Sequence, residues 1–444
     1  MYEAGVSCGP PEPAGDGRCA DLVLGDRLAT RPDRCELSLD LLGRSHVTAE
    51  VDSALTSGGL HRILHLARRH LDMDLAFLTE FTDGKQIYRG LAGDAASFGL
   101  QPDDAVPVTE TYCRLMTAGE IPNAIADTAA VPLVRDLRVT GLVGIGSYVG
   151  VPVHLPDGSL YGSLCTVSHT TQPVDERDAK FLRMLAELLA VELKAEQDRA
   201  SERARIERLI DDDRLEIALQ PIVDLRFGDV AGAEALSRFP GEFGPPDAVF
   251  GAAHRVGVGS ALEWVAARRA FETLPLLAPG AYLAINLAPS VAIELAGVSM
   301  ETPDLPVDRL VVEITEHAAV ENYAVLRDSL ATARERGLRL AIDDAGAGYA
   351  SLQHVVELAP DLIKVDRSLV DGVAEDSARR SVVRAFVSLA ADLDAVVVAE
   401  GVELEADLDT VRSLGVDAAQ GYLFARPSTD RAALRKWMAS RFSR

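Results

Sequence analysis

Acidic and amide side chains end almost every apolar run in the second half of this 444-residue chain. The runs cover residues 217–223, 230–236, 282–287, 310–314, 338–342, 362–365, 395–399 and 418–424. The polar residues in them or directly after them are Glu234, Asn286, Glu313, Asp343, Asp344, Lys364, Glu400, Glu403 and Gln420. One such acid is usually a helix cap. Several acids brought together at one edge of a fold would repel one another unless cations neutralised them. Because the possible ligands are all oxygens, the favoured cations are Mg²⁺ or Mn²⁺.

The adjacent acids Asp343 and Asp344 suggest what such cations would do. Two neighbouring carboxylates can bridge or flank two ions, and two ions ~3.5–4 Å apart are the usual arrangement for attack of water on a phosphodiester. Lys364, between two apolar residues, could orient that water or accept its proton if the cations lowered its pKa. The alternative for Lys364 is a salt bridge to one of the acids.

The spacing of the runs predicts the scaffold that positions these side chains. Amphipathic stretches at 261–277, 323–336, 378–393 and 404–414 alternate with the apolar runs. Continuously apolar strands that alternate with helices indicate a covered sheet, and eight of them favour a β/α barrel. In such barrels the chemistry lies at the carboxyl ends of the strands, where the acids are expected.

Residues 205–435, about half of the chain, resemble an EAL domain, the family that hydrolyses cyclic di-GMP to the linear dinucleotide pGpG. Eight stretches match in the family's order: QPIV (220–223), EALSR (234–238), NL (286–287), EITE (313–316), DD (343–344), IKVD (363–366), AEGVE (399–403) and QGYLF (420–424). One of them alone would be weak, but eight in order are specific. The resemblance implies a TIM-like (β/α)8 barrel whose first strand is antiparallel.

The resemblance also implies a role for each matching residue. One metal would be held by Glu234, Asn286, Glu313 and Asp343, and a second by Asp343 with Asp344. The implied catalytic residues are Glu234, Lys364 and Glu400, the last two placing and activating the water. The implied substrate contacts are Gln220, Leu236 and Arg238, with the Arg238 guanidinium on a phosphate. The implied supporting residues are Glu316 and Glu403 for the loops and Gln420 for the hydrated metal.

The loop after Asp344 departs from the family pattern. The family usually has Phe then Gly, and later Gly-Tyr-Ser-Ser, whereas residues 345–351 here read AGAGYAS. The metal and base positions are all retained, so hydrolysis remains the prediction. Because Ala345 replaces the usual Phe, the loop loses packing near the metals. We expect this loss to affect the rigidity of the loop, and through it the catalytic rate or a dimer contact. A receptor that binds cyclic di-GMP without cleaving it, or an interaction protein, stays open as the alternative.

Residues 46–195 have an α+β pattern. A helical stretch at 54–71 precedes strands at 75–81 and 86–92 around Asp83-Gly84, and a second hairpin spans 147–155 and 160–168. A long helix begins near Glu176, which predicts a sheet with helices on one face. This order, with GVPV (150–153), PDG (156–158) and YGSLC (161–165), resembles a GAF sensory domain.

The ligand of this GAF-like region is left open by the sequence. Cys113 and Cys165 could attach or ligate a cofactor, or they could be small buried apolar residues. The Cys-His pair of a bilin site is missing. His61, His65 and His70 lie on one helix without an evident third metal ligand, which favours a surface or stacking role.

Composition limits the partners and the compartment. Lys plus Arg total 44 and Asp plus Glu total 68, a net charge of −24, which disfavours a broad nucleic-acid-binding face. Neither a run of ~18 apolar residues nor a secretory start is seen, so we expect a cytoplasmic protein. The five cysteines (Cys8, Cys19, Cys35, Cys113 and Cys165) are interpreted as reduced thiols.

The predicted organisation has four parts. A flexible tail covers 1–45, a GAF-like sensory domain 46–195, a polar helical connector 196–210 and an EAL phosphodiesterase domain 211–444. Because the helix from Glu176 loses its apolar face after Lys194, the connector is expected to be a solvated link or a dimer-forming stalk. From the connector and from the family resemblance we expect a homodimer, and the resemblance implies cyclic di-GMP as the ligand.

Overall fold

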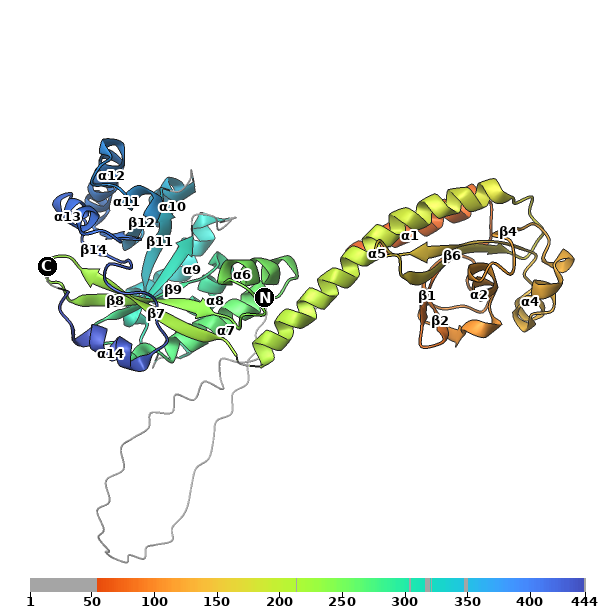
Figure 1. Cartoon of the computed structure of the whole chain (residues 1–444), viewed down its shortest axis with the longest axis horizontal. Helices are drawn as coiled ribbons and strands as arrows, with labels where there is room; N and C mark the ends of the chain where they lie inside the picture. The colour runs from red at the N-terminus through yellow and green to blue at the C-terminus, as the bar shows by residue number, and fades with distance from the viewer. Residues whose placement is uncertain are drawn as a thin grey trace, which may run out of the picture. The chain divides into compact units, whose positions relative to one another are not determined.

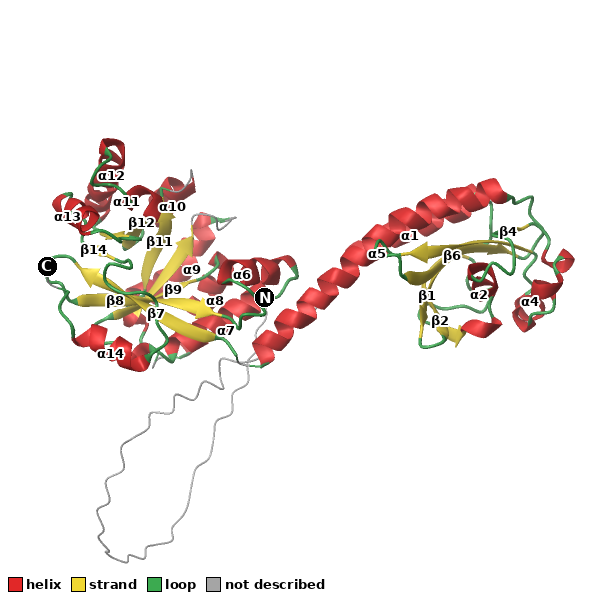
Figure 2. Ribbon diagram, in the orientation of Figure 1, coloured by secondary structure: helices red, strands yellow, loops and turns green. Residues whose placement is uncertain are grey.

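The computed structural model describes residues 54–212, 214–302, 305–315, 320, 322–346 and 350–442. Two separate sheets are formed, one between residues 75 and 168 and one between residues 216 and 419 (Figure 2). The predicted tail at 1–45 lies outside the described residues. None of the helices in the described ranges combines the length and the apolar composition that a membrane span requires.

The first sheet has six strands in the order β3-β2-β1-β6-β5-β4. The strands are β1 (Leu75–Thr82), β2 (Lys85–Gly93), β3 (Ala105–Pro107), β4 (Ala124–Ile125), β5 (Ser147–His154) and β6 (Leu160–Ser168). Both predicted hairpins are confirmed, β1 with β2 and β5 with β6. The first one turns at Asp83 and Gly84, which have positive φ angles of 49° and 72°.

Two helices cover one face of this sheet, as predicted. Helices α1 (Ala54–His70) and α5 (Glu176–Asp211) pack on it through buried residues that include Leu64, Leu182 and Leu189. The histidines of α1, for which a surface or stacking role was expected, contact other rings: the centroids of His61 and His65 are 4.3 Å apart in an edge-to-face arrangement, and those of His70 and Phe181 are 3.9 Å apart in a tilted one.

The other face of the sheet is also covered, which the sequence pattern did not predict. Short helices lie over it: η2 (Val108–Glu110), α2 (Tyr112–Thr117), η3 (Thr128–Ala130), α3 (Pro132–Arg135) and α4 (Arg138–Val143). Buried side chains of α2 and α3, with partly buried ones of α4, form a second core with residues of the sheet such as Phe77 and Tyr148. These segments are too short to produce a helical periodicity that sequence inspection could detect.

Helix α5 is uninterrupted for 36 residues and begins with a capping box between Asp175 and Asp178. The predicted connector lies inside it. Its last turns regain an apolar face, because Ile206 and Leu209 are buried in a cluster with Leu262. The helix therefore ends packed on the elements around α6 (Pro246–Arg255) and α7 (Gly259–Phe271).

The second sheet is a closed barrel with the order β10-β11-β12-β13-β14-β7-β8-β9. Its strands are β7 (Glu216–Asp224), β8 (Val230–Arg238), β9 (Tyr282–Asn286), β10 (Leu310–Thr315), β11 (Arg339–Ala345), β12 (Leu362–Val365), β13 (Val396–Ala399) and β14 (Ala418–Ala419). Strand β7 is antiparallel to both β8 and β14, and the other neighbours are parallel, which confirms the expected topology. The last apolar run, 418–424, is a strand only over its first two residues.

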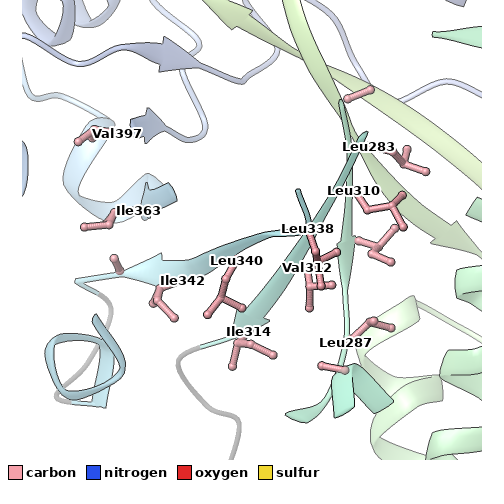
Figure 3. Close-up of a cluster of buried hydrophobic side chains, with 14 of the residues drawn as sticks. Leu283, Leu287, Leu310, Val312, Ile314, Leu338, Leu340, Ile342, Ile363 and Val397 are labelled. Atoms are coloured by element: carbon pink, nitrogen blue, oxygen red, sulfur yellow. The ribbon is translucent and has the colours of Figure 1, made fainter. Parts of the chain in front are cut away.

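Helices surround this barrel on its outer side (Figure 1). In addition to α6 and α7 they are η4 (Leu274–Leu276), α8 (Pro289–Glu301), η5 (Val307–Arg309), α9 (Tyr323–Glu335), α10 (Ala350–Leu358), α11 (Arg367–Val370), α12 (Ser377–Leu393), α13 (Glu405–Ser413) and α14 (Arg431–Ala439). The main core lies between strands and helices and includes Leu283, Val312, Leu340, Ile342, Ile363 and Val397 (Figure 3). The intervening residues face inward, because successive side chains of a strand point to opposite faces.

A candidate metal centre at the barrel rim

The inward-facing layer of the barrel determines which side chains reach the rim. Its residues are Ile222, Tyr282, Ala284, Val311, Ala341, Leu362, Val398 and Ala418. Two residues further along the parallel strands lie Asn286, Glu313, Asp343, Lys364, Glu400 and Gln420. Since strand side chains alternate with a period of two, all six point to the inner side at the carboxyl end of the barrel. The structure thus brings these predicted residues together.

Glu234 and Gln220 reach the same place from the antiparallel pair β7 and β8. Gly232 on β8 faces inward, because a Cβ there would lie 2.6 Å from the Tyr282 ring. Glu234 follows two residues later and is paired in register with Gln220. Gln220 precedes Ile222 by two residues, rather than following it, because β7 runs in the opposite direction.

The ammonium group of Lys364 lies at the centre of the site. Its Nζ is 2.7 Å from Asp343 Oδ1, 2.8 Å from Glu400 Oε1, 3.0 Å from Glu313 Oε2 and 3.7 Å from Glu234 Oε2. The side chain is only 1 % exposed. Burial alone would lower the pKa of Lys364, but the surrounding carboxylates, Asp343 foremost, raise that pKa well above its usual range. The salt-bridge interpretation of Lys364 is thus confirmed, with several acids instead of one.

The carboxylates outnumber the cation that faces them. Burial raises the pKa of both Glu313 and Glu400 well above the usual range, the nearby Lys364 opposing the shift. Burial, and then the charge of Asp343, raise the pKa of Asp344 to about 6. Burial is the first cause of each shift and neighbouring carboxylates add to it, so divalent cations bound among these acids would favour their ionised forms.

Two overlapping groups of oxygens could hold such cations. One oxygen each from Glu234, Glu313 and Asp343 lie within 4.8 Å of one another, and the same holds for Asp343, Asp344 and Glu400. Asp343 belongs to both groups, which fits two metal ions that share one carboxylate ligand. Because the ligands are oxygens and partly buried, the residues present fit Mg²⁺ or Mn²⁺.

Amide side chains hold the carboxylates in place. Asn286 Nδ2 donates to Glu234 Oε1 at 3.0 Å and to Glu313 Oε2 at 3.1 Å. Gln420 Nε2 donates to Glu234 Oε2 and, at 3.2 Å, to Gln220 Oε1. Gln420 Oε1 is buried and accepts no hydrogen bond from the described residues. A water bound to a metal would satisfy it, since buried acceptors are rarely left unpaired.

A backbone irregularity presents the two adjacent acids together. The register of β11 against β12 shifts between Ile342 and Ala345, and Asp344 has a φ of 54°. In a regular strand Asp343 and Asp344 would point to opposite faces. The left-handed residue breaks this alternation at a cost of about 1–3 kcal/mol, so that both carboxylates reach Glu400.

The predicted substrate residues continue along β8 from Glu234. Leu236 and Arg238 lie two and four residues after Glu234, on the same face of β8, and both are half-buried. Arg238 donates to the carbonyl oxygen of Ser237 at 2.8 Å, and among the described residues it has no ion pair. Its guanidinium could therefore accept a phosphate.

The predicted supporting residues are placed in part. Glu403 forms an ion pair with Arg367 at 2.9 Å, which ties the segment after β13 to the start of α11. Glu316 lies outside the described residues.

One buried carboxylate near the site was not singled out by the sequence. Glu263 on α7 is 6 % exposed; its Oε2 accepts the Ala288 N–H at 2.7 Å, and its Oε1 lies 2.7 Å from His254 Nε2. Ala288 is two residues after Asn286, so Glu263 fixes the backbone that follows this candidate metal ligand. An acid between Leu262 and Trp264, inside an apolar helical stretch, was the available signal.

Comparison with known proteins identifies the families. The EAL domain model matches residues 203–427, and the GAF domain model matches residues 56–193. The chain is 31% identical over 297 residues to the cyclic di-GMP phosphodiesterase NbdA of Pseudomonas aeruginosa, covering 63% of this chain and 37% of that protein. It is 30% identical over 301 residues to the cyclic di-GMP phosphodiesterase PdeF of Escherichia coli, covering 63% and 38%.

Two similar solved structures each cover about half of this chain. Klebsiella pneumoniae BlrP1, in a complex with manganese and cyclic di-GMP, is 33% identical with a TM-score of 0.43, covering 48% of this chain and 56% of that one. An EAL domain protein of Listeria monocytogenes is 26% identical with a TM-score of 0.45, covering 51% and 94%. The chain spans 37–38% of the length of the two named phosphodiesterases. Since the EAL model spans about half of the chain, this protein belongs to the EAL domain family, with a GAF domain preceding the EAL domain.

Proposed function

We propose that the barrel is a divalent-metal-dependent phosphodiesterase that hydrolyses cyclic di-GMP to linear pGpG under the control of the GAF domain. The observation that carries this proposal is the pair of overlapping carboxylate groups that share Asp343 and surround Lys364. Family membership and the names of the two phosphodiesterase relatives support the substrate.

Each side chain of the site has a part in this proposal. One ion would be held by Glu234, Asn286, Glu313 and Asp343, and the other by Asp343 with Asp344. When bound, the ions polarise the attacking water and stabilise the charge that gathers on the phosphoryl oxygens. Glu400 accepts a proton from that water, while the Lys364 ammonium, 2.8 Å away, keeps the Glu400 carboxylate oriented.

The substrate is held on the β8 side of the rim. Arg238 pairs with a phosphate group, to which a guanidinium can donate two parallel hydrogen bonds. Leu236 offers an apolar contact to a base, and Gln220 offers a polar one. On a chain with a net charge of −24, a local cationic group is needed to attract a dianionic dinucleotide.

The proposal is tested with the purified full chain, cyclic di-GMP and either Mg²⁺ or Mn²⁺, with products separated by chromatography. Linear pGpG is expected, its formation stopping with a chelator and resuming when Mn²⁺ is restored. Glu234→Gln should abolish turnover, whereas Glu335→Gln, on the exposed end of α9, should leave it unchanged. Binding of cyclic di-GMP that survives chelation, without turnover after Mn²⁺ is restored, would overturn the enzyme proposal in favour of a receptor.

A second copy of the chain is the protein partner we propose. Helix α5 has no buried residue between Ala190 and Ile206 among the residues described, so this stretch is open for a second copy to lie along it. Light scattering of the full chain checks this, and a monomeric mass at micromolar concentration would reject the dimer.

A further inference from the structure

The GAF domain contains two free thiols that the phosphodiesterase proposal does not use. Cys113 of α2 and Cys165 of β6 are both free thiols, 1 % and 0 % exposed. Their Sγ atoms are 3.5 Å apart although 52 positions separate them in the sequence. The tertiary structure, not sequence spacing, therefore makes them a pair.

The surroundings of the two thiols differ. Cys165 Sγ lies 3.3 Å from Ser163 Oγ and 3.4 Å from Tyr148 Oη, and burial raises the pKa of Cys165 well above its usual range. A hydrogen bond from Cys165 lowers the pKa of Cys113. Cys113 lines the cavity described next and Cys165 does not, so Cys113 is the thiol that a small molecule meets first and Cys165 is the thiol that reacts second.

A cavity gives a small molecule access to Cys113. It has a volume of about 330 Å³ and is lined by Cys113, Phe77, Tyr88, Tyr148 and Gln86, among others. Gln86 is buried, and its Oε1 accepts no hydrogen bond from the described residues. A small guest that carries O–H groups would satisfy this acceptor next to the Cys113 sulfur.

We propose that Cys113 and Cys165 form a reversible intramolecular disulfide when hydrogen peroxide enters this cavity. The Cys113 thiolate attacks one peroxide oxygen, the O–O bond breaks, and the other oxygen leaves as hydroxide, which takes up a proton to become water. Cys113 is then a sulfenic acid. The Cys165 sulfur attacks the Cys113 sulfur, the S–O bond breaks, and a second water leaves with the Cys165 proton. Two thiols are oxidised, and one peroxide is reduced to two waters.

The geometry permits this closure. A disulfide bond is about 2.05 Å long, so sulfurs that start 3.5 Å apart must approach by about 1.5 Å. Cys113 lies on a helix of six residues and is one of the residues that line the cavity. Cys165 lies in the middle of β6, paired with strands on both sides, and provides the fixed partner.

The test uses the full chain with Cys8, Cys19 and Cys35 changed to Ser, so that Cys113 and Cys165 are its only thiols. After peroxide treatment, unfolding and alkylation, we expect both thiols to be lost and the tryptic peptides 90–114 and 139–177 to be linked. Dithiothreitol should restore both thiols.

The matched variant adds Cys165→Ser to this background. It should form a sulfenic acid on Cys113, trapped by dimedone, and no internal disulfide, while thermal unfolding verifies that it is folded. Three results would overturn the proposal: both thiols still alkylated after excess peroxide, a linkage found only between chains, or Cys113 overoxidised to sulfinic acid while Cys165 is still free.

Discussion

Lys364 on β12 and Asp343 on β11 meet across neighbouring parallel strands, with Nζ 2.7 Å from Oδ1. Asp343 contributes an oxygen to both groups of possible metal ligands, so Lys364 contacts the one carboxylate that the two groups share. The Lys364 ammonium therefore supplies a positive charge among the candidate metal ligands. The same acids that would bind two metal ions stabilise its protonated state.

Replacing Lys364 by Met is expected to reduce both stability and turnover. Removal of the ammonium leaves several buried carboxylates facing one another, which costs about 3–5 kcal/mol for a broken buried ion pair. We expect a lower unfolding temperature in chelator, part of which Mn²⁺ restores, and a loss of about 10²-fold or more in kcat. Lys436→Met on α14 is the exposed control. An unchanged unfolding temperature for Lys364→Met would contradict the central role of this charge.

Replacing Glu313 by Gln should have effects of opposite sign on stability and on activity. Glu313 uses Oε2 for its contacts with both Lys364 and Asn286, so a Gln carbonyl oxygen can accept both hydrogen bonds. One uncompensated buried charge disappears, which is expected to raise the free energy of unfolding in chelator by about 1 kcal/mol. Stabilisation by Mn²⁺ and turnover should be lost, as urea unfolding and the pGpG assay would show. A destabilised Glu313→Gln protein with full activity would refute this account.

The stability of the metal-free protein is expected to fall as pH rises through the acid range. Asp344 has a pKa of about 6 in the folded chain and an ordinary value of 3.8, so the folded state binds the proton more tightly. Unfolding then becomes easier as pH rises from about 4 to about 6, and Glu313 and Glu400 extend the effect upward. Lys364, with its raised pKa, contributes stability throughout this window.

Metal should reverse this pH dependence, because cations bind the deprotonated oxygens. The rise in unfolding temperature caused by Mn²⁺ is therefore expected to increase across the same window. Thermal unfolding in chelator and in Mn²⁺ at several pH values measures both effects. Asp344→Asn should flatten the lower part of the curve, and a Mn²⁺ effect independent of pH would rule out these carboxylates as the ligands.

Substituting Glu263 tests whether the backbone after Asn286 must be held. Glu263→Ala removes the acceptor of the Ala288 N–H and is expected to raise the Mn²⁺ concentration needed for half-maximal rate by about 10–100-fold. Glu263→Gln retains one acceptor oxygen and should recover most of the affinity. If the alanine variant lost stability but kept its Mn²⁺ requirement, Glu263 would have a structural role only.

Gly421→Ala should disturb the placement of Gln420. A Cβ at Gly421 would lie 2.1 Å from Val402 O and 2.3 Å from Val402 N, and both are backbone atoms that cannot move aside easily. We expect a loss of about 1–3 kcal/mol in the free energy of unfolding, together with reduced turnover. Gly297→Ala, on α8 with open space around it, is the control and should be neutral or slightly stabilising.

Most of the barrel strands, the residues at their ends and the first GAF hairpin could be predicted from the sequence alone. The apolar runs predicted the strands, because a barrel strand covered on both faces needs apolar residues throughout, and the polar residue in or after almost every run marked the rim. The positions of Glu234, Glu313 and Lys364 on their strands follow directly from this pattern. The Asp83-Gly84 turn likewise specified the first GAF hairpin through its backbone preference.

Other features were decided only by the tertiary structure. The left-handed Asp344, the two-residue strand β14, the Glu263 contact with Ala288 and the approach of Cys113 to Cys165 depend on segments far apart in the chain. Strand alternation assigns a side chain to a face but does not say which side chains of other strands lie opposite. That is decided when the barrel closes and the register of each strand pair is set, because only then do distant residues acquire distances from one another.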